Sequence, residues 1–162
     1  MNPITENQKT RSPRWAIRIG FTSGLAGWMA LIFFLSSLTA EQASLTWPND
    51  TFVVSWLGTW QSTLAHLLLF GMLAVLIQAS MWSWTTFAYR PLRLTIGAIV
   101  LASLYGISDE IHQSFVAGRT MAATDAAVDA LGAAVGVAVV RQAVIWARRS
   151  PFSPSGLEAS KA

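Results

Sequence analysis

The chain has 162 residues, of which 53% are hydrophobic and only 12% are charged. Soluble domains carry about 25% charged residues, so this composition argues against an ordinary water-soluble fold. The net charge is +3, but the basic residues flank long apolar stretches instead of forming a basic patch, which argues against nucleic-acid binding. Because the chain contains no cysteine, disulfides, thiol nucleophiles and thiolate metal sites are excluded.

Four apolar stretches approach the roughly 20 residues needed to cross the hydrocarbon core of a bilayer. In chain order they are Trp15–Leu38, Thr63–Met81, Leu92–Ser108 and Ala122–Trp146. The first could be a secretory signal peptide, but its apolar run is about twice the usual length and ends without a good cleavage site, so we expect a retained anchor. The predicted fold is all-α: a four-span transmembrane helix bundle within residues 15–147.

The basic residues predict an orientation. Ten of the eleven lie around the start of the first span, the junction between the second and third spans, or the end of the fourth, whereas Arg119 lies after the third span. Because short loops rich in Lys and Arg stay in the cytoplasm, both termini are predicted to be cytoplasmic. Residues 1–14 and 148–162 are then cytoplasmic tails, and the Pro- and Ser-containing second tail is predicted to be disordered.

The first outer connection, between the first and second spans, is rich in aromatic residues. Phe52, Trp56 and Trp60 recur every four residues after a break at Pro48, which is the spacing of a helix. Since tryptophan prefers the headgroup level of a membrane, we predict a short interfacial helix here. Its simplest role is to anchor the bundle.

Polar side chains concentrate at the outer ends of the third and fourth spans. If the third helix continues past Ser108, one of its faces carries Ser103, Gly106, Glu110 and Gln113, with Asp109 and His112 on the adjacent strip. One stripe of the fourth span carries Asp125, Asp129, Gly132 and Gly136. Lipid contact by two carboxylates is costly and a GxxxG pair permits close helix approach, so this stripe is expected to face another helix.

Arg119 lies between these two spans and is expected to pair with one of the acids. A guanidinium binds carboxylate or phosphate in a bidentate manner and stays charged where solvation is poor. His66, about one turn into the second span, is expected to lie at a depth in the membrane similar to that of Asp125 or Asp129. The sequence therefore predicts an outer polar pocket, with the ligand-binding residues Glu110, Gln113, Arg119, Asp125, Asp129 and His66.

The residues of this region resemble a known family. Ser108-Asp109-Glu110-Ile111-His112-Gln113-Ser114-Phe115 is followed by Gly118-Arg119, by Asp125, by Leu131-Gly132-Ala133 and by Gly136. This pattern is similar to that of the VanZ-like family of small bacterial membrane proteins. Together with weaker similarities in the first two spans, the resemblance covers roughly Trp15 to Val140.

The chain departs from that pattern at two places. Ser62-Thr63 stands where relatives often have Asp-Lys, and Asp129 stands where many have Asn. The resemblance implies a multi-pass protein of the bacterial inner membrane. The family's namesake is linked to resistance to the glycopeptide teicoplanin, but the resemblance implies no known reaction.

Several interpretations of the pocket stay open. Its polar residues could form a satisfied network that only fixes helix packing. Alternatively, the pocket could bind an anionic cell-envelope lipid or other amphiphile from the outer leaflet, with Arg119 holding the phosphate or carboxylate. The protein would then contribute to envelope properties or glycopeptide resistance.

An enzyme acting on a lipid-linked substrate is a further alternative. His66 or His112 could exchange protons near neutral pH, and Glu110 or Asp125 could act as a base. The candidate catalytic residues are accordingly Glu110, His112 and Asp125, although the sequence establishes no reaction.

No metal or cofactor is predicted. Suitable nitrogen and oxygen ligands are present in His66, His112, Asp109, Glu110, Asp125 and Asp129. However, no dense ligand motif appears, because Glu110 and His112 lie about 200° apart on a helix.

Transport is disfavoured, since the polar groups lie at the outer end and not at the midplane. Gly132 and Gly136 could join two copies of the chain, or could pack spans within one copy.

Overall fold

The computed structural model describes residues 14–39, 41–42, 60–85 and 91–149. These residues form the long helices α1 (Arg14–Ser36), α4 (Trp60–Trp84), α5 (Pro91–Gln113) and α6 (Ala123–Arg149), and contain no strand. The prediction of an all-α fold is confirmed. The two tails lie almost wholly outside the described residues, as does most of the segment predicted to form the interfacial helix.

All four helices are long and apolar enough to cross a membrane, as predicted. The spans cover Arg14–Ser36, Ser62–Trp84, Leu92–Gln113 and Ala123–Ala147. Large apolar side chains on their outer faces stay exposed, among them Leu68 and Leu104, as expected of surfaces that face lipid. The largest difference from the predicted bounds is at α5, which continues five residues past Ser108 to Gln113. The condition for placing Glu110 and Gln113 on one helix face is therefore met.

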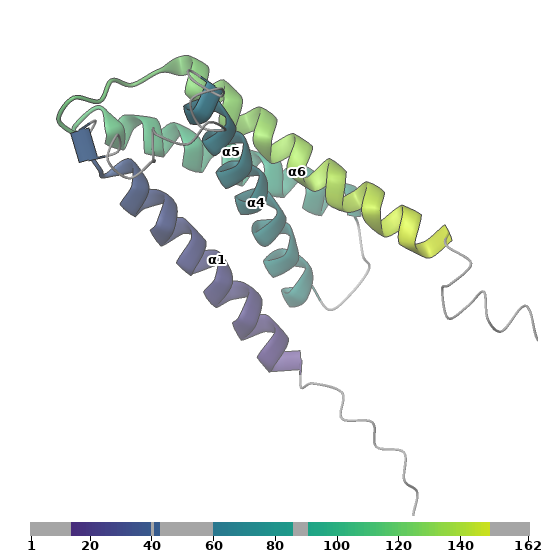
Figure 1. The fold of residues 1–162 in the computed structure, drawn as a ribbon. Coiled ribbons are helices and arrows are strands. Elements are labelled where there is room, and N and C mark those ends of the chain that lie inside the picture. The colour runs from purple at the N-terminus through teal and green to yellow at the C-terminus, as the bar shows by residue number, and fades with distance from the viewer. Residues whose placement is uncertain (1–13, 40, 43–59, 86–90, 150–162) are drawn as a thin grey trace, which may run out of the picture.

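Helix α4 packs against α1, α5 and α6 and lies between α1 and α6 in the bundle (Figure 1). Its buried residues Phe70, Leu73 and Ala74 are part of the apolar core. The neighbouring helices contribute Ile32 from α1, Ala98 and Ala102 from α5, and Ala133 and Val137 from α6. Most of the residues from α5 and α6 are alanines, and their small side chains allow the helix axes to approach closely.

The closest helix contact joins α4 and α6 through glycines. Gly71 of α4 lies against Gly132 and Gly136 of α6. A Cβ atom at Gly132 would stand 2.6 Å from the carbonyl oxygen of Leu67 and 2.9 Å from its Cα, so this position has no room for a side chain. The glycine stripe of the fourth span thus faces another helix of the same chain, which is one of the two roles predicted for it.

Side-chain hydrogen bonds join α1 to the rest of the bundle. The indole of Trp28 donates to the carbonyl oxygen of Leu69 in α4 at 2.9 Å. The hydroxyl of Tyr105 in α5 donates to the carbonyl oxygen of Met29 at 2.9 Å. Each bond reaches a backbone oxygen near the middle of a span, where water cannot replace it, and so fixes the position of α1.

Replacing Gly132 with alanine is expected to destabilise the protein by about 1–3 kcal/mol, because the new methyl group meets the backbone of Leu67 and overpacks the contact. The matched control is Gly24→Ala in α1, where an added Cβ has no neighbour within 4 Å. There alanine should leave the free energy of unfolding unchanged or raise it, since alanine favours helix. Unfolding in detergent micelles measures both variants, and equal stability of the two would contradict the proposed contact.

Candidate functional site

The polar residues meet at one end of the bundle, where α1 and α5 end and α6 begins (Figure 1). Residues 114–122 connect α5 to α6 there, and Gly118 takes a left-handed backbone conformation with φ 75°. This conformation favours glycine, so Gly118 sets the turn that places Arg119. His66 of α4 lies at this same end.

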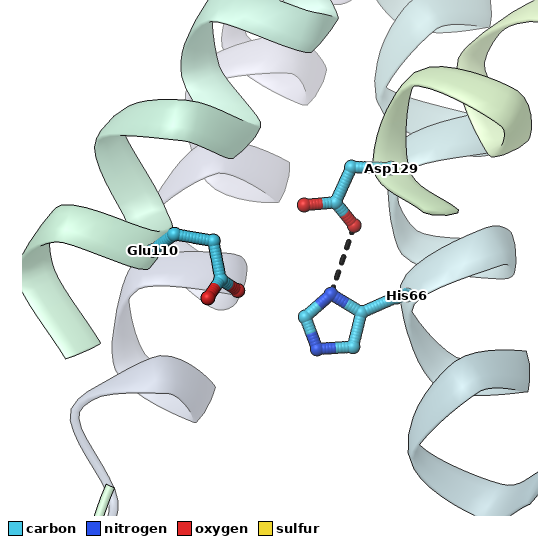
Figure 2. A group of neighbouring side chains, drawn as sticks. All are labelled: His66, Glu110 and Asp129. Atoms are coloured by element: carbon cyan, nitrogen blue, oxygen red, sulfur yellow. Dashed lines mark hydrogen bonds and ion pairs between the residues drawn. The ribbon is translucent and has the colours of Figure 1, made fainter. Parts of the chain in front are cut away.

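Three ionisable side chains from three helices point toward one another in this region (Figure 2). His66 of α4 and Asp129 of α6 form a hydrogen-bonded pair, with 2.8 Å between Nδ1 and Oδ1. Glu110 of α5 faces them. A ring nitrogen of His66 and one carboxylate oxygen each of Glu110 and Asp129 lie within 4.8 Å of one another. Glu110 is 1% exposed and Asp129 is fully buried. We refer to these three residues as the triad.

A glycine of α5 also shapes the triad. A Cβ atom at Gly106 of α5 would stand 2.8 Å from Oδ2 of Asp129 and 2.9 Å from its Cβ. Gly106 lies one turn before Glu110 on the same buried face of α5. Without a side chain at this position, α5 comes close enough to α6 for the two carboxylates to share one small space.

One oxygen of Glu110 is held by the backbone. The N–H of Ala122, just before α6 begins, donates to Oε2 of Glu110 at 2.9 Å. A carboxylate at a helix N-terminus is favoured by the helix dipole, so this bond ties the end of α5 to the start of α6. The sequence could not reveal it, because a backbone donor is available at every residue except proline.

Two buried oxygens of the triad have no hydrogen-bond donor within the described part of the chain. They are Oε1 of Glu110 and Oδ2 of Asp129. Buried polar atoms are nearly always hydrogen-bonded, and a partly satisfied polar cluster is costly in a low dielectric. The side chains of the triad therefore lie close together, but two of their buried oxygens lack a hydrogen-bond donor in the described part of the chain.

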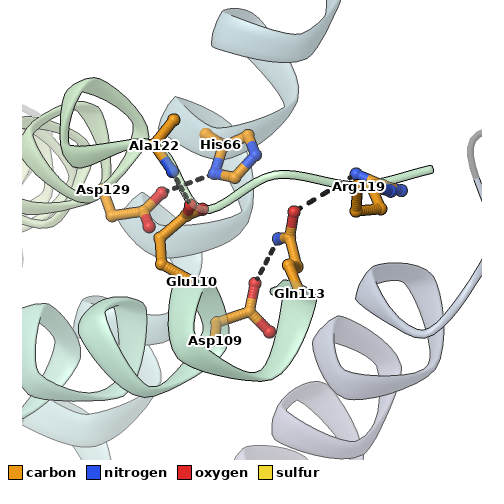
Figure 3. Close-up of polar contacts among 7 residues, drawn as sticks. All are labelled: His66, Asp109, Glu110, Gln113, Arg119, Ala122 and Asp129. Carbon is orange, nitrogen blue, oxygen red and sulfur yellow. Dashed lines mark hydrogen bonds and ion pairs between the residues drawn. The ribbon is translucent and has the colours of Figure 1, made fainter. Parts of the chain in front are cut away.

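A second chain of contacts leads from α5 to Arg119 (Figure 3). The amide of Gln113 donates to Oδ2 of Asp109 at 2.9 Å, and its oxygen accepts from Nη1 of Arg119 at 3.3 Å. Nε of Arg119 donates to the carbonyl oxygen of Leu38 at 3.2 Å. Asp109 was not predicted as a site residue, although its spacing of four residues from Gln113 was the signal for this bond.

The expected ion pair between Arg119 and an acid is not formed among the described residues. Arg119 binds two neutral oxygens instead. The physical reason is that Glu110 and Asp129 turn inward, to the start of α6 and to His66, while the side chain of Gln113 lies between Arg119 and Asp109. The positive charge of Arg119 is thus left without an acidic partner in this part of the chain.

The remaining two candidates lie outside these contacts. His112 faces α1, where its ring stacks on Phe33 with 4.5 Å between centroids and its Nε2 lies 3.0 Å from Oγ of Ser37. Asp125 is partly buried in the first turn of α6, and its side chain forms no hydrogen bond within the described ranges. The structure therefore brings Glu110, Asp129 and His66 together, places Gln113 and Arg119 beside them, and separates His112 from them.

Comparison with known proteins identifies the family. A family model described as VanZ/LLP1 matches residues 21–146. The chain belongs to the VanZ/LLP1 family. The resemblance seen in the sequence is confirmed, and with four apolar helices the protein is a multi-pass membrane protein. No curated protein and no solved structure matches the chain.

Replacing Gln113 with leucine is expected to lower the free energy of unfolding by about 1–3 kcal/mol, because Oδ2 of the buried Asp109 would lose its donor. The matched control is Gln142→Leu, at an exposed position of α6, which should change stability by less than about 0.5 kcal/mol. Thermal or denaturant unfolding in detergent measures both. If the two variants were equally stable, the Asp109–Gln113–Arg119 chain of contacts would not hold this end of the bundle together.

Proposed function

We propose that this VanZ/LLP1-family protein binds an anionic amphiphile, such as a cell-envelope lipid, at the polar end of its bundle. In this way it contributes to envelope properties or to glycopeptide resistance. The observation that carries the proposal is the state of Arg119, which is partly buried and, among the residues that the structure describes, bonded only to neutral oxygens of Leu38 and Gln113. A guanidinium near the membrane boundary binds phosphate or carboxylate well, and an anionic headgroup would supply the missing counter-charge.

The surface around Arg119 suits an amphiphile. Phe115 and Met121, on either side of it in the connection, are 83% and 56% exposed. Apolar side chains beside a cation at the end of a bundle favour a ligand that has both an acyl chain and a charged head. A membrane lipid or a lipid-linked anion has this character, whereas a nucleic acid does not.

An apolar groove between α1, α4 and α5 adds support. Its volume is about 440 Å³. Its lining consists of Leu25, Met29, Leu73, Ile77, Ser80, Met81, Leu101, Leu104, Tyr105 and Ser108. The lining reaches Ser108, about one and a half turns before Gln113, so a chain in this groove would have its head near the polar end.

The basic residues support an orientation for this site. Those described at the opposite end of the helices are Arg14, Arg18, Arg93, Arg141 and Arg149. By the positive-inside rule, that end faces the cytoplasm, and we propose that both termini are cytoplasmic in a bacterial inner membrane. The polar end would then meet the outer leaflet, from which an envelope amphiphile can enter.

The bonding of the triad argues against a purely structural role for the polar residues. A network that only fixed helix packing would be expected to satisfy its buried atoms, yet Glu110 and Asp129 each keep an oxygen without a donor in the described chain. The three candidate catalytic residues are not brought together, because His112 is turned toward α1 and only Glu110 joins the triad, where His66 is the neighbouring histidine. A role in an enzyme therefore gains less support than binding. Binding is therefore the function that the geometry favours.

Replacing Arg119 with glutamine is expected to weaken binding of phosphatidylglycerol by about tenfold to a hundredfold, which corresponds to the loss of charge-assisted hydrogen bonds. Binding is measured by native mass spectrometry of the purified protein in detergent, with phosphatidylcholine as the zwitterionic comparison. The wild-type protein should prefer phosphatidylglycerol, and the variant should lose that preference.

The matched control is Arg93→Gln, which removes an exposed arginine at the other end of the bundle and should leave the preference intact. Circular dichroism and size-exclusion chromatography show whether each variant is folded. A folded Arg119→Gln protein that still prefers phosphatidylglycerol would contradict the proposal. A variant that does not fold would instead assign Arg119 a structural role.

A further inference from the structure

We propose that His66, Glu110 and Asp129 form a binding site for a divalent transition-metal ion, for which Zn²⁺ is the best fit. One imidazole and two carboxylates are a ligand set that zinc accepts, and zinc is bound by three protein ligands where a fourth position stays open. Softer thiolate ligands are missing from the chain, which has no cysteine. The sequence led us to expect no metal because it contains no dense ligand motif, but the fold assembles the ligands from three separate helices.

The spacing of the ligand atoms fits an ion. The three candidate atoms lie within 4.8 Å of one another. Ligands bonded to one tetrahedral zinc ion stand about 3.3 Å apart, so small side-chain movements would bring them to the required spacing. The 2.8 Å contact between His66 and Asp129 has the length of a hydrogen bond, and a metal ion would replace the proton in it, as metal ligands must give up their protons.

The two free oxygens provide an independent observation. Oε1 of Glu110 and Oδ2 of Asp129 are buried and have no donor among the residues that the structure describes, and Figure 2 shows both carboxylates directed into the space beside His66. Leaving carboxylates buried without partners is costly. A cation between them would satisfy both oxygens.

The surroundings of Glu110 fit the supporting role seen around metal ligands. The N–H of Ala122 holds Oε2, which orients the carboxylate and leaves Oε1 for the ion. Metal-binding carboxylates are commonly fixed by such an outer hydrogen bond. Arg119, the centre of the proposed anion site, is not one of the ligands, so this inference does not depend on the proposed function.

The test is metal binding by the purified full-length protein. The protein is prepared in detergent with an affinity tag that contains no histidine, stripped with EDTA, and dialysed against Zn²⁺. Elemental analysis should find about one zinc ion per chain. Zn²⁺ should also raise the unfolding midpoint, because a ligand that binds only the folded state stabilises it. Mn²⁺ and Fe²⁺ are tested in parallel to establish which ion binds most tightly.

Matched variants locate the ion. His66→Gln, Glu110→Gln and Asp129→Asn keep the size of each side chain and should weaken Zn²⁺ binding by more than about tenfold. His112→Gln removes the only other histidine of the chain and should bind zinc as the wild type does. Arg119→Gln should also keep its zinc, which separates this site from the proposed lipid site.

Either of two results would overturn the proposal. One is a wild-type protein that neither retains nor is stabilised by Zn²⁺, Mn²⁺ or Fe²⁺, which would mean that a proton holds the carboxylates together. The other is equal zinc binding by His66→Gln and His112→Gln, which would mean adventitious surface binding. If the triad variants do not fold, Co²⁺ bound to the wild-type protein decides, because a site with nitrogen and oxygen ligands gives visible absorption bands and their absence would overturn the proposal.

Discussion

The structure depends on placing the carboxylate of Asp129 in the middle of a helix contact within a membrane-spanning bundle. Asp129 is fully buried, and the nearest polar group that meets it is His66, at 2.8 Å. Such burial requires α4, α5 and α6 to approach closely, and glycines at the contact make this possible: Gly106 beside Asp129, and Gly71 against Gly132. Because charge in hydrocarbon is costly, the buried carboxylates lie between helices at the polar end of the bundle, while the lipid-facing surfaces carry apolar side chains.

Hydrophobicity and periodicity were enough to predict the helices and the faces of α5 and α6. In a bilayer, the backbone N–H and C=O groups of four long apolar stretches can form their hydrogen bonds only within helices. The spacing of Glu110, Gln113 and Asp129 predicted that they lie on inward faces, and they are buried in the structure. What the sequence could not predict were the choices among partners. Several acids lie close to Arg119 in the sequence. The directions in which the side chains point in the fold determine that Arg119 binds Gln113 and Leu38.

The position of His112 shows the same limit. The spacing predicted that His112 lies on a strip next to that of Glu110. It did not predict which neighbouring residue His112 would contact. In the structure it lies against Phe33 of α1 and Ser37, the residue after α1, so the two histidines of the chain have different environments. The contact between His112 and Ser37 joins residues 75 positions apart, and a local pattern carries no information about such pairs.

The two proposed sites complement each other in charge. The triad and Asp109 concentrate carboxylates at the polar end of the bundle, and an anionic headgroup at Arg119 would be repelled by them unless something offsets their charge. The side chain of Gln113 lies between Arg119 and Asp109, and Glu110 of the triad lies next to Gln113, farther from Arg119 (Figure 3). A divalent cation at the triad would remove most of that repulsion. Anion binding at Arg119 should therefore be stronger in the metal-bound protein than in the stripped one, because the two positive charges of the ion offset the carboxylates of Glu110 and Asp129 and so remove their Coulomb repulsion of the anion.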